Sequence, residues 1–155
     1  MKKILIRDMR EGDIPHVVQI ERLSFPTPWS ETSFLNEIYK LRSLARVAIF
    51  DEVIAGYLCA EQVLDEGHIL NLAVHPDFRG MGVAKVLVKQ VMEEMRQNGC
   101  RVLYLEVRSS NAIAKRLYER FGFRVIGTRK RYYVTPEEDA IIMAGEIPCP
   151  PADQF

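Results

Sequence analysis

Residues 70–84 read LNLAVHPDFRGMGVA, and this stretch decides the fold and the chemistry that the sequence predicts. Its apolar first part, as far as Val74, predicts a strand, and Gly80 and Gly82 let the backbone turn tightly and approach a ligand closely. The helix that follows begins with amides that lack intrahelical partners and carry the positive end of the helix dipole. Together these parts predict an anion site, most often one for phosphate or pyrophosphate, and Arg79 adds a positive charge beside it.

The two commoner phosphate-binding loops do not fit these residues. A Walker loop ends in Gly-Lys-Ser/Thr, but Gly82 is followed by Val83 and Ala84. A dinucleotide-binding loop has the pattern G-x-G-x-x-G, and counting from Gly80 the last position is Lys85. The residues alone therefore leave open a simpler interpretation, in which the two glycines only shape a turn.

Helical patterns alternate with short apolar runs along the rest of the chain. From Gly82 to Gln97 apolar residues recur at three- and four-residue spacing, and Gly99 ends this helix. Asp13 and Ser30 each predict the cap of an earlier helix. The apolar faces expected on these two helices are Ile14, Val17, Val18 and Leu23, and Phe34, Leu35, Ile38 and Leu41.

Strands fill most of the intervals, and Asn111 caps a fourth helix that Gly122 ends. The expected strands are Ile4–Met9, a hairpin of 44–50 and 53–64, Ile69–Val74, Val102–Val107, 123–128 with an extension toward Tyr133, and 140–147. This order predicts the α+β class, with a mixed, mostly antiparallel sheet of about seven strands and helices on both faces. A chain of 155 residues fits one domain, which we expect over residues 1–147, and the Pro-rich segment 148–155 predicts a loose tail.

Composition argues against several classes of partner. Lys and Arg together number 21, as do Asp and Glu, and a formal net charge of zero is unlike that of a general nucleic-acid binder. The first apolar run stops at Arg7, too early for a signal peptide, and no run reaches the roughly 18 residues of a membrane span. We therefore expect a cytoplasmic protein, a monomer or weak dimer, that binds neither nucleic acid nor membrane.

The cysteines and histidines predict no metal site. The three cysteines are far apart and odd in number, which is typical of reduced thiols in an intracellular protein. His16, His68 and His75 have no partners at metal-ligand spacing, so we assign these histidines no role.

The spacing Arg79-x-x-Gly82-x-Ala84 after an apolar strand resembles the acetyl-CoA loop of the Gcn5-related N-acetyltransferases (GNAT). Further motifs resemble the RimI-type ribosomal-protein-alanine N-acetyltransferases, over about residues 4–147. These motifs are FP (25–26), PWS (28–30), LEVRSSNA (105–112), LYE (117–119), FGF (121–123), YY (132–133) and EDAIIM (138–143). One departure is visible, because the segment FPTPW at 25–29 is two residues longer than the family's usual Phe-Pro-Trp.

The resemblance implies that acetyl-CoA is the co-substrate, without a metal, and that particular residues bind it. Leu72, Ala73 and Val74 would offer backbone groups to the pantetheine arm and the acetyl carbonyl, where family members splay two parallel strands apart. Asn111 would contact CoA near the thioester. The pyrophosphate would be held through the main-chain amides of Arg79, Gly80, Met81, Gly82, Val83 and Ala84.

The resemblance also implies that Glu106 is the general base and Tyr118 the general acid. It places Trp29, Tyr132 and Tyr133 against the acceptor. The chemistry is consistent with a single carboxylate base, since an α-amine with a pKa near 7.8 is partly neutral at pH 7, whereas a Lys amine with a pKa near 10.4 is almost wholly charged. A tyrosine hydroxyl, with a pKa near 10, is a plausible proton donor to a thiolate.

Periodicity alone leaves alternatives open for these residues. Glu106 shares a strand face with Tyr104, opposite Leu103, Leu105 and Val107, and so fits a solvent-facing position equally well. Tyr118 fits a core aromatic, Asn111 a simple helix cap, and Tyr132 and Tyr133 ordinary strand aromatics.

The combined prediction is acetyl transfer from acetyl-CoA to the N-terminal α-amine of a protein, namely the N-terminal alanine of a small-subunit bacterial ribosomal protein. Two alternatives stay open: the same chemistry on a Lys side chain or a small-molecule amine, and a CoA-binding module without turnover. The acidic run 137–139, next to Tyr132 and Tyr133, suggests a docking point for a basic peptide, unless it is only a solvated loop.

Overall fold

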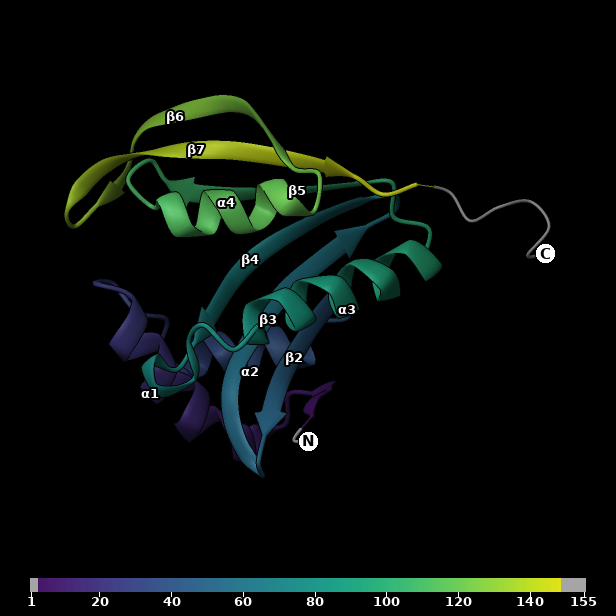
Figure 1. Cartoon of the computed structure of the whole chain (residues 1–155), viewed down its shortest axis with the longest axis vertical. Helices are drawn as coiled ribbons and strands as arrows, with labels where there is room; N and C mark the ends of the chain where they lie inside the picture. The colour runs from purple at the N-terminus through teal and green to yellow at the C-terminus, as the bar shows by residue number, and fades with distance from the viewer. Residues whose placement is uncertain (1–2, 149–155) are drawn as a thin grey trace. The chain divides into compact units, whose positions relative to one another are not determined.

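The computed structural model describes residues 3–148, so the expected tail lies outside the described residues except for Pro148. The elements in chain order are β1 (Ile4–Asp8), η1 (Glu11–Asp13), α1 (Ile14–Ser24), α2 (Glu31–Tyr39), β2 (Ser43–Phe50), β3 (Val53–Val63), β4 (Glu66–Val74), η2 (Pro76–Phe78), α3 (Val83–Gln97), β5 (Val102–Arg108), α4 (Ala112–Arg120), β6 (Arg124–Val134) and β7 (Glu137–Glu146) (Figure 1). The strands have the hydrogen-bonded order β1-β2-β3-β4-β5-β7-β6. The predicted α+β class with a seven-stranded sheet is therefore confirmed.

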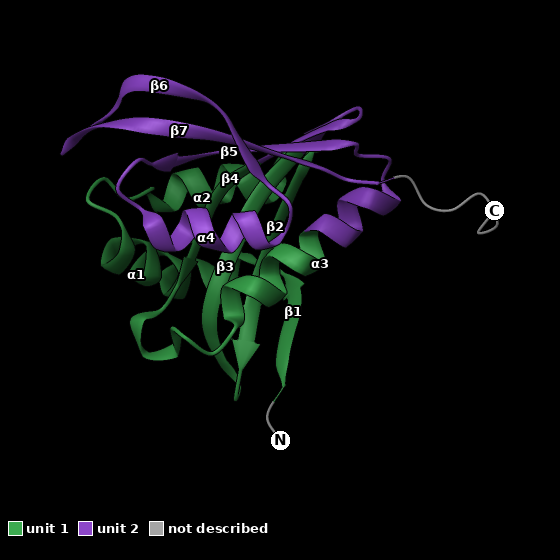
Figure 2. Cartoon of the chain, turned by 45° about the horizontal axis from the view of Figure 1, so that its top comes forward, with its two compact units in different colours: residues 1–61, 69–91 green, residues 62–68, 92–155 purple. Residues whose placement is uncertain are grey.

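The sheet is mixed, as predicted. The pairs β1–β2, β2–β3, β5–β7 and β6–β7 are antiparallel, and β4 pairs with β5 in parallel. The chain folds as two compact units (Figure 2): unit 1 contains residues 1–61 and 69–91, and unit 2 contains residues 62–68 and 92–155. Both β4 and α3 pass from one unit into the other, and each unit is described by itself below.

Helices cover both faces of the strands in unit 1, as predicted. Successive residues of a strand point to opposite faces, and Gly56 and Tyr57 of β3 show this. The ring of Tyr57 packs edge-on against Phe34 of α2, with 5.4 Å between centroids. A Cβ on Gly56 would lie 3.1 Å from Cγ1 of Val83, at the start of α3. Helices α1 and α2 therefore pack on one face and α3 on the other (Figure 1).

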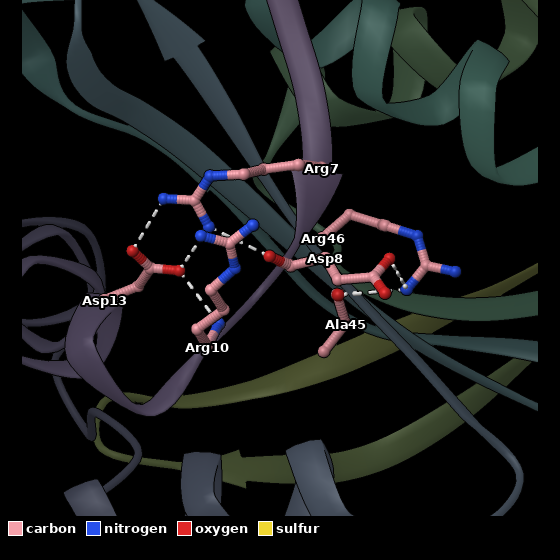
Figure 3. A network of polar contacts seen from close by, with 6 residues as sticks. All are labelled: Arg7, Asp8, Arg10, Asp13, Ala45 and Arg46. Carbon is pink, nitrogen blue, oxygen red and sulfur yellow. Dashed lines mark hydrogen bonds and ion pairs between the residues drawn. The ribbon is translucent and has the colours of Figure 1, made fainter.

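Asp13 begins α1 but does not cap it in the predicted way, because its backbone is already helical and its side chain bonds to no helix amide. Arg7 instead donates from Nη1 and Nη2 to the two carboxylate oxygens, at 2.7 and 2.9 Å, and the Arg10 amide donates at 2.8 Å (Figure 3). The hydrogen bonds from Arg7 are the main reason that the pKa of Asp13 lies below its ordinary value. Asp13 thus fastens the end of β1 to the start of α1.

Two of the residues predicted on the buried helix faces, Leu23 and Leu41, are exposed, and the buried carboxylate of Glu21 explains the first of them. Leu23 is 54% exposed, whereas Glu21 is 1% exposed. Residues two apart on a helix lie on nearly opposite sides, so burying Glu21 turns Leu23 to solvent. Leu41 is 97% exposed because α2 ends at Tyr39 and Leu41 lies in the turn that follows.

The carboxylate of Glu21 accepts hydrogen bonds from three separate segments of unit 1. The Tyr57 hydroxyl of β3 donates to Oε1, and Asn71 of β4 donates its side-chain amide to the same oxygen at 2.7 Å. The backbone amide of Trp29, in the loop between α1 and α2, donates to Oε2 at 2.8 Å. Burial raises the pKa of the Tyr57 hydroxyl, which keeps its proton for this bond. One buried side chain therefore joins a helix, a loop and two strands.

In unit 2, β5 separates two sets of side chains. Leu103 and its alternate neighbours are buried, as predicted, and Leu103 is paired with Gly145 of β7. A Cβ on Gly145 would lie 3.0 Å from the ring of Phe123, which packs against Tyr118 of α4. Paired residues share a face of a sheet, so α4 covers the Leu103 face (Figure 1). Glu106 is three residues further along β5 and lies on the opposite face.

Replacing Glu21 by Leu should destabilise the fold by about 2–5 kcal/mol, because the donors of Tyr57, Asn71 and Trp29 would lose their acceptor inside the core. Urea unfolding measures this loss. The matched control is Glu31→Leu, at an exposed position in the first turn of α2, which should change the stability by less than about 0.5 kcal/mol. Equal losses in the two variants would contradict a structural role for the Glu21 carboxylate.

Candidate active site

The predicted anion loop joins β4 to α3 within unit 1. Gly80 and Gly82 have φ angles of 79° and 84°, in the left-handed region that favours glycine. The amide of Val86 donates to the Gly82 carbonyl at 3.1 Å and makes the first turn of α3. By helix geometry, the amides just before Val86 have no acceptor within the helix. The loop therefore has the backbone conformation and the free helix amides on which the prediction depends.

Arg79 holds the loop in place through its side chain. Its Nε donates to the Val74 carbonyl at 3.1 Å, and one Nη lies 3.4 Å from the Ser24 hydroxyl. Its backbone amide donates to the Pro76 carbonyl at 3.4 Å. Arg79 thus keeps its charge beside the loop, while its amide and part of its guanidinium are used within unit 1.

The strand that precedes the loop also uses some of its polar groups internally. The Leu72 amide donates to Oδ1 of Asn71, its neighbour in β4, at 3.1 Å, and the Val74 carbonyl accepts from Arg79. A Cβ on Gly56 would lie 2.8 Å from the Ala73 carbonyl oxygen, so β3 and β4 approach closely at this point. Only a residue without a side chain fits there, and Gly56 is a supporting position that the sequence analysis missed.

Glu106 lies on β5 of unit 2 with 15% of its side chain exposed, and it has a partner that the sequence analysis missed. The Nε2 atom of His68, on β4, lies 2.6 Å from Oε2 of Glu106. The parallel ladder pairs His68 with Tyr104, which puts His68 on the Glu106 face of the strands. Metal-ligand spacing in the sequence gives His68 no role, but alternation along the strands predicts the pair once their register is known.

Tyr118 is buried on the other face of β5. It is 5% exposed and packs against Phe123, with 5.4 Å between ring centroids. Burial raises the pKa of the Tyr118 hydroxyl, so the side chain stays protonated. Tyr118 is therefore a core aromatic, as periodicity alone suggested, and its hydroxyl carries a proton.

Asn111 caps α4, as predicted, by accepting a hydrogen bond from the Ala114 amide at 3.1 Å. The loop before it is held by Glu138 of β7, which accepts from the Ser109 hydroxyl at 3.0 Å and the Ser110 amide at 2.6 Å. Hydrogen bonds from Ser110, then from Ser109 and Arg108, lower the pKa of Glu138 to about 2. The cap therefore uses the side-chain oxygen of Asn111, and Glu138 fixes the loop that precedes it.

The two tyrosines of β6 differ in exposure. Tyr132 is 46% exposed, and Tyr133 is half-buried beneath the guanidinium of Arg108, which lies 4.2 Å from its ring centroid. Burial raises the pKa of Tyr133 to about 12. Arg108 also donates to the carbonyls of Thr135 and Pro136, at 3.1 and 3.0 Å. Arg108 therefore fastens the β6–β7 turn to the end of β5, next to the tyrosines.

Carboxylates of the acidic run 137–139 are paired within unit 2. Glu138 lies 3.4 Å from Arg108, Glu137 lies 3.2 Å from Arg131, and Asp139 accepts from the Arg131 amide at 2.8 Å. The charge that a basic peptide would meet here is thus largely balanced. This segment fixes the loops around Asn111 and Tyr133 rather than standing as a free acidic patch.

Trp29 of unit 1 is half-buried and packs on Phe34, with 5.2 Å between ring centroids. Its amide is held by Glu21, so its loop is fixed in spite of the two extra residues in 25–29. Part of the Trp29 ring therefore packs in the core, and the exposed part of the ring is accessible to an acceptor.

The described residues, 3–148, contain no group of three or more His, Cys, Asp or Glu side chains placed to hold a metal ion. Cys59 and Cys100 are buried free thiols, and Cys149 lies outside the described range. None of the described helices has the length and apolarity needed to cross a membrane. Unit 2 has a cavity of about 320 Å³ that contains none of the predicted site residues. Its lining is Val102, Tyr104, Gly122, Arg124, Ile126, Ala144 and Glu146.

Comparison with known proteins identifies relatives along most of the chain. The model of the family described as "Acetyltransferase (GNAT) family" matches residues 14–123. The ribosomal protein bS18-alanine N-acetyltransferase of Salmonella typhimurium is 40% identical over 135 residues, which cover 85% of this chain and 90% of that protein.

Solved structures agree with this match. The crystal structure of the ribosomal-protein-S18-alanine N-acetyltransferase from Escherichia coli has a TM-score of 0.88 and 33% identity, and covers 99% of both chains. Arabidopsis thaliana NAA60 in complex with acetyl-CoA has a TM-score of 0.84 over 94% of this chain and 99% of its own, but at 24% identity it shows the fold alone.

The pKa of Glu138 generates a prediction about stability and pH. Because this pKa falls from 4.5 to about 2 on folding, the folded state favours the carboxylate, and the resulting stabilisation is present above about pH 5 and lost as the pH falls from 4.5 toward 2. The difference in unfolding free energy between wild type and Glu138→Gln, measured in urea, should therefore be smaller at pH 3 than at pH 6.

The matched control is Glu137→Gln, one residue earlier, whose ion pair with Arg131 is exposed on both sides and should contribute little at either pH. A Glu138→Gln difference that does not change between pH 6 and pH 3 would refute this role for Glu138.

Proposed function

The chain belongs to the GNAT acetyltransferase family, and from that premise we propose that it acetylates the N-terminal alanine of ribosomal protein bS18. The observation that carries the proposal is the match to the E. coli enzyme named for this reaction, with 33% identity over 99% of both chains. Acetyl-CoA is the acetyl donor. With a ribosomal acceptor, we expect the reaction to take place in the cytoplasm.

The anion loop of unit 1 suits the pyrophosphate of acetyl-CoA. Gly80 and Gly82 turn the backbone so that the amides of the loop and of the first turn of α3 can donate to phosphate oxygens. Arg79 contributes by fixing the loop to Val74 and Ser24 and by keeping a positive charge beside it. In this role the main chain of residues 80–84 binds the anion, and Arg79 supports it.

Glu106 is the general base in this proposal. The acceptor amine loses a proton as its nitrogen attacks the thioester carbonyl, and the carboxylate of Glu106 accepts that proton directly or through water. The thioester C–S bond breaks as the amide forms, and the departing CoA thiolate takes a proton from the Tyr118 hydroxyl. Burial raises the pKa of that hydroxyl, so Tyr118 holds a proton to give when the thiolate leaves.

The arrangement of unit 2 supports this division of roles. The side chain of Glu106 projects from one face of β5, and Tyr118 of α4 packs on the opposite face. In acyl transfer the nucleophile and the leaving group are different substituents of one tetrahedral carbon, so their base and their acid must reach different atoms. A strand with the base on one face and the acid on the other meets that requirement.

Replacing either group should slow the reaction without weakening the binding of acetyl-CoA. We expect Glu106→Gln and Tyr118→Phe each to lower kcat by roughly 10²–10⁴-fold, since each removes a proton-transfer group. Fixed-time assays of CoA release with a bS18 peptide that starts with Ala measure the rate, and calorimetry measures the affinity for acetyl-CoA.

Two exposed residues provide controls for this pair, Glu119→Gln on α4 and Tyr39→Phe on α2. Both should keep wild-type rates. If Glu106→Gln and Tyr118→Phe also keep wild-type rates, the assigned roles are wrong.

The nature of the acceptor gives a separate prediction. A peptide with a free N-terminal alanine should be acetylated, and its N-blocked twin that contains Lys should not, because one carboxylate base suits an amine that is already partly neutral at pH 7. Mass spectrometry locates the acetyl group. Acetylation of the blocked peptide or of a polyamine alone would replace the α-amine assignment, and binding of acetyl-CoA without transfer to any amine would indicate a binding module.

A further inference from the structure

We propose that His68 is a positioning residue for the general base. Its imidazole holds one oxygen of the Glu106 carboxylate, which leaves the other oxygen aimed at the acceptor amine or at the water that precedes it. This inference rests on the proposed function, because it gives His68 a purpose only if Glu106 accepts a proton.

The contact is short and lies in a part of unit 2 that the backbone already fixes. Nε2 of His68 and Oε2 of Glu106 are 2.6 Å apart. The ladder between β4 and β5 pairs Glu66 with Val102, and His68 with Tyr104, so the two strands are joined without help from these side chains. His68 and Glu106 have 36% and 15% of their side chains exposed, which leaves the pair accessible from solvent.

A carboxylate base gains from such a partner because its terminal torsion is soft. The last torsion of a glutamate has a broad, roughly twofold distribution, so an unsupported carboxylate samples many orientations of its oxygens. A hydrogen bond from Nε2–H of His68 to Oε2 of Glu106 selects one of them and is strengthened by the carboxylate charge. The tautomer with hydrogen on Nε2 is the neutral form that can donate this bond.

The proton balance of the step is unchanged by His68. The N–H bond of the amine breaks, its proton goes to Oε1 of Glu106, and the nitrogen electron pair forms the new C–N bond. The imidazole keeps its own proton on Nε2 throughout. His68 therefore acts through Glu106 and need not touch the substrate.

Two substitutions separate the hydrogen bond from the size of the side chain. His68→Leu removes the donor, and His68→Gln replaces it with an amide N–H that can reach Glu106. We expect His68→Leu to lower kcat roughly 10- to 100-fold with the KM for acetyl-CoA unchanged, and His68→Gln to keep kcat within about threefold of wild type. His16→Leu, at an exposed position of α1, is the matched control and should keep wild-type kinetics.

A double-mutant cycle tests whether His68 acts through Glu106. If it does, the variant carrying both His68→Leu and Glu106→Gln should be no slower than Glu106→Gln alone. Three results would each overturn the inference. The first is a wild-type kcat in His68→Leu, and the second is an equal loss of kcat in His68→Leu and His68→Gln. The third is a double variant that is slower than Glu106→Gln by the same factor by which His68→Leu is slower than wild type.

The same set of proteins separates this inference from the proposed function. Wild-type protein that acetylates no amine, or Glu106→Gln that is as fast as wild type, refutes the assigned chemistry and the role of His68 with it. An active wild type and a slow Glu106→Gln beside an unimpaired His68→Leu refute the role of His68 alone. The inference would also be overturned if His68→Leu lowered the thermal midpoint of unfolding but kept the kcat of the wild type. That result would indicate a structural contact only.

Discussion

The buried carboxylate of Glu21 is the interaction on which unit 1 depends. An isolated charge at 1% exposure would be strongly unfavourable, and here Tyr57, Asn71 and the Trp29 amide make it tolerable. The same bonds fix the parts of unit 1 that the chemistry needs: the strand that leads into the anion loop and the loop that carries Trp29. A polar contact inside the core therefore sets the positions of groups that a hydrophobic contact would hold less specifically.

Carboxylates serve in the same way at other irregular segments, where each accepts a backbone amide that no helix or strand satisfies. Asp13 accepts from Arg10 after β1, Glu138 from Ser110 before α4, and Asp139 from Arg131 within β6. In this chain of zero formal net charge, several carboxylates therefore accept hydrogen bonds from the protein's own backbone. Composition argued against nucleic acid as a partner, but it said nothing of these anchors.

Local rules predicted what local interactions determine. Ser30 and Asn111 cap their helices through amides three residues away, and the hairpin turn at Asp51 and Glu52 adopts the positive φ angles expected of a two-residue turn. The resemblance of the motifs to a family supplied the site residues. Glu21 bonds to Tyr57 and Asn71, 36 and 50 residues away, and Glu106 to His68, 38 residues away, so no spacing rule could reach these partners. They depend on strand register, which the folded sheet alone specifies.

Strand register also explains how, in the proposed mechanism, one short strand can serve both ends of the reaction. The side chains of β5 alternate, so Glu106 shares a half-exposed face with His68 while the opposite face is sealed by Tyr118 and its neighbours. An incoming amine arrives from water and gives up its proton on the accessible side, whereas a leaving thiolate is best protonated where water is excluded. A shift of β5 by one residue would exchange these faces, placing the carboxylate in the core and an apolar side chain beside the amine. The alternation that builds the core is thus the same property that separates the proposed base from the proposed acid.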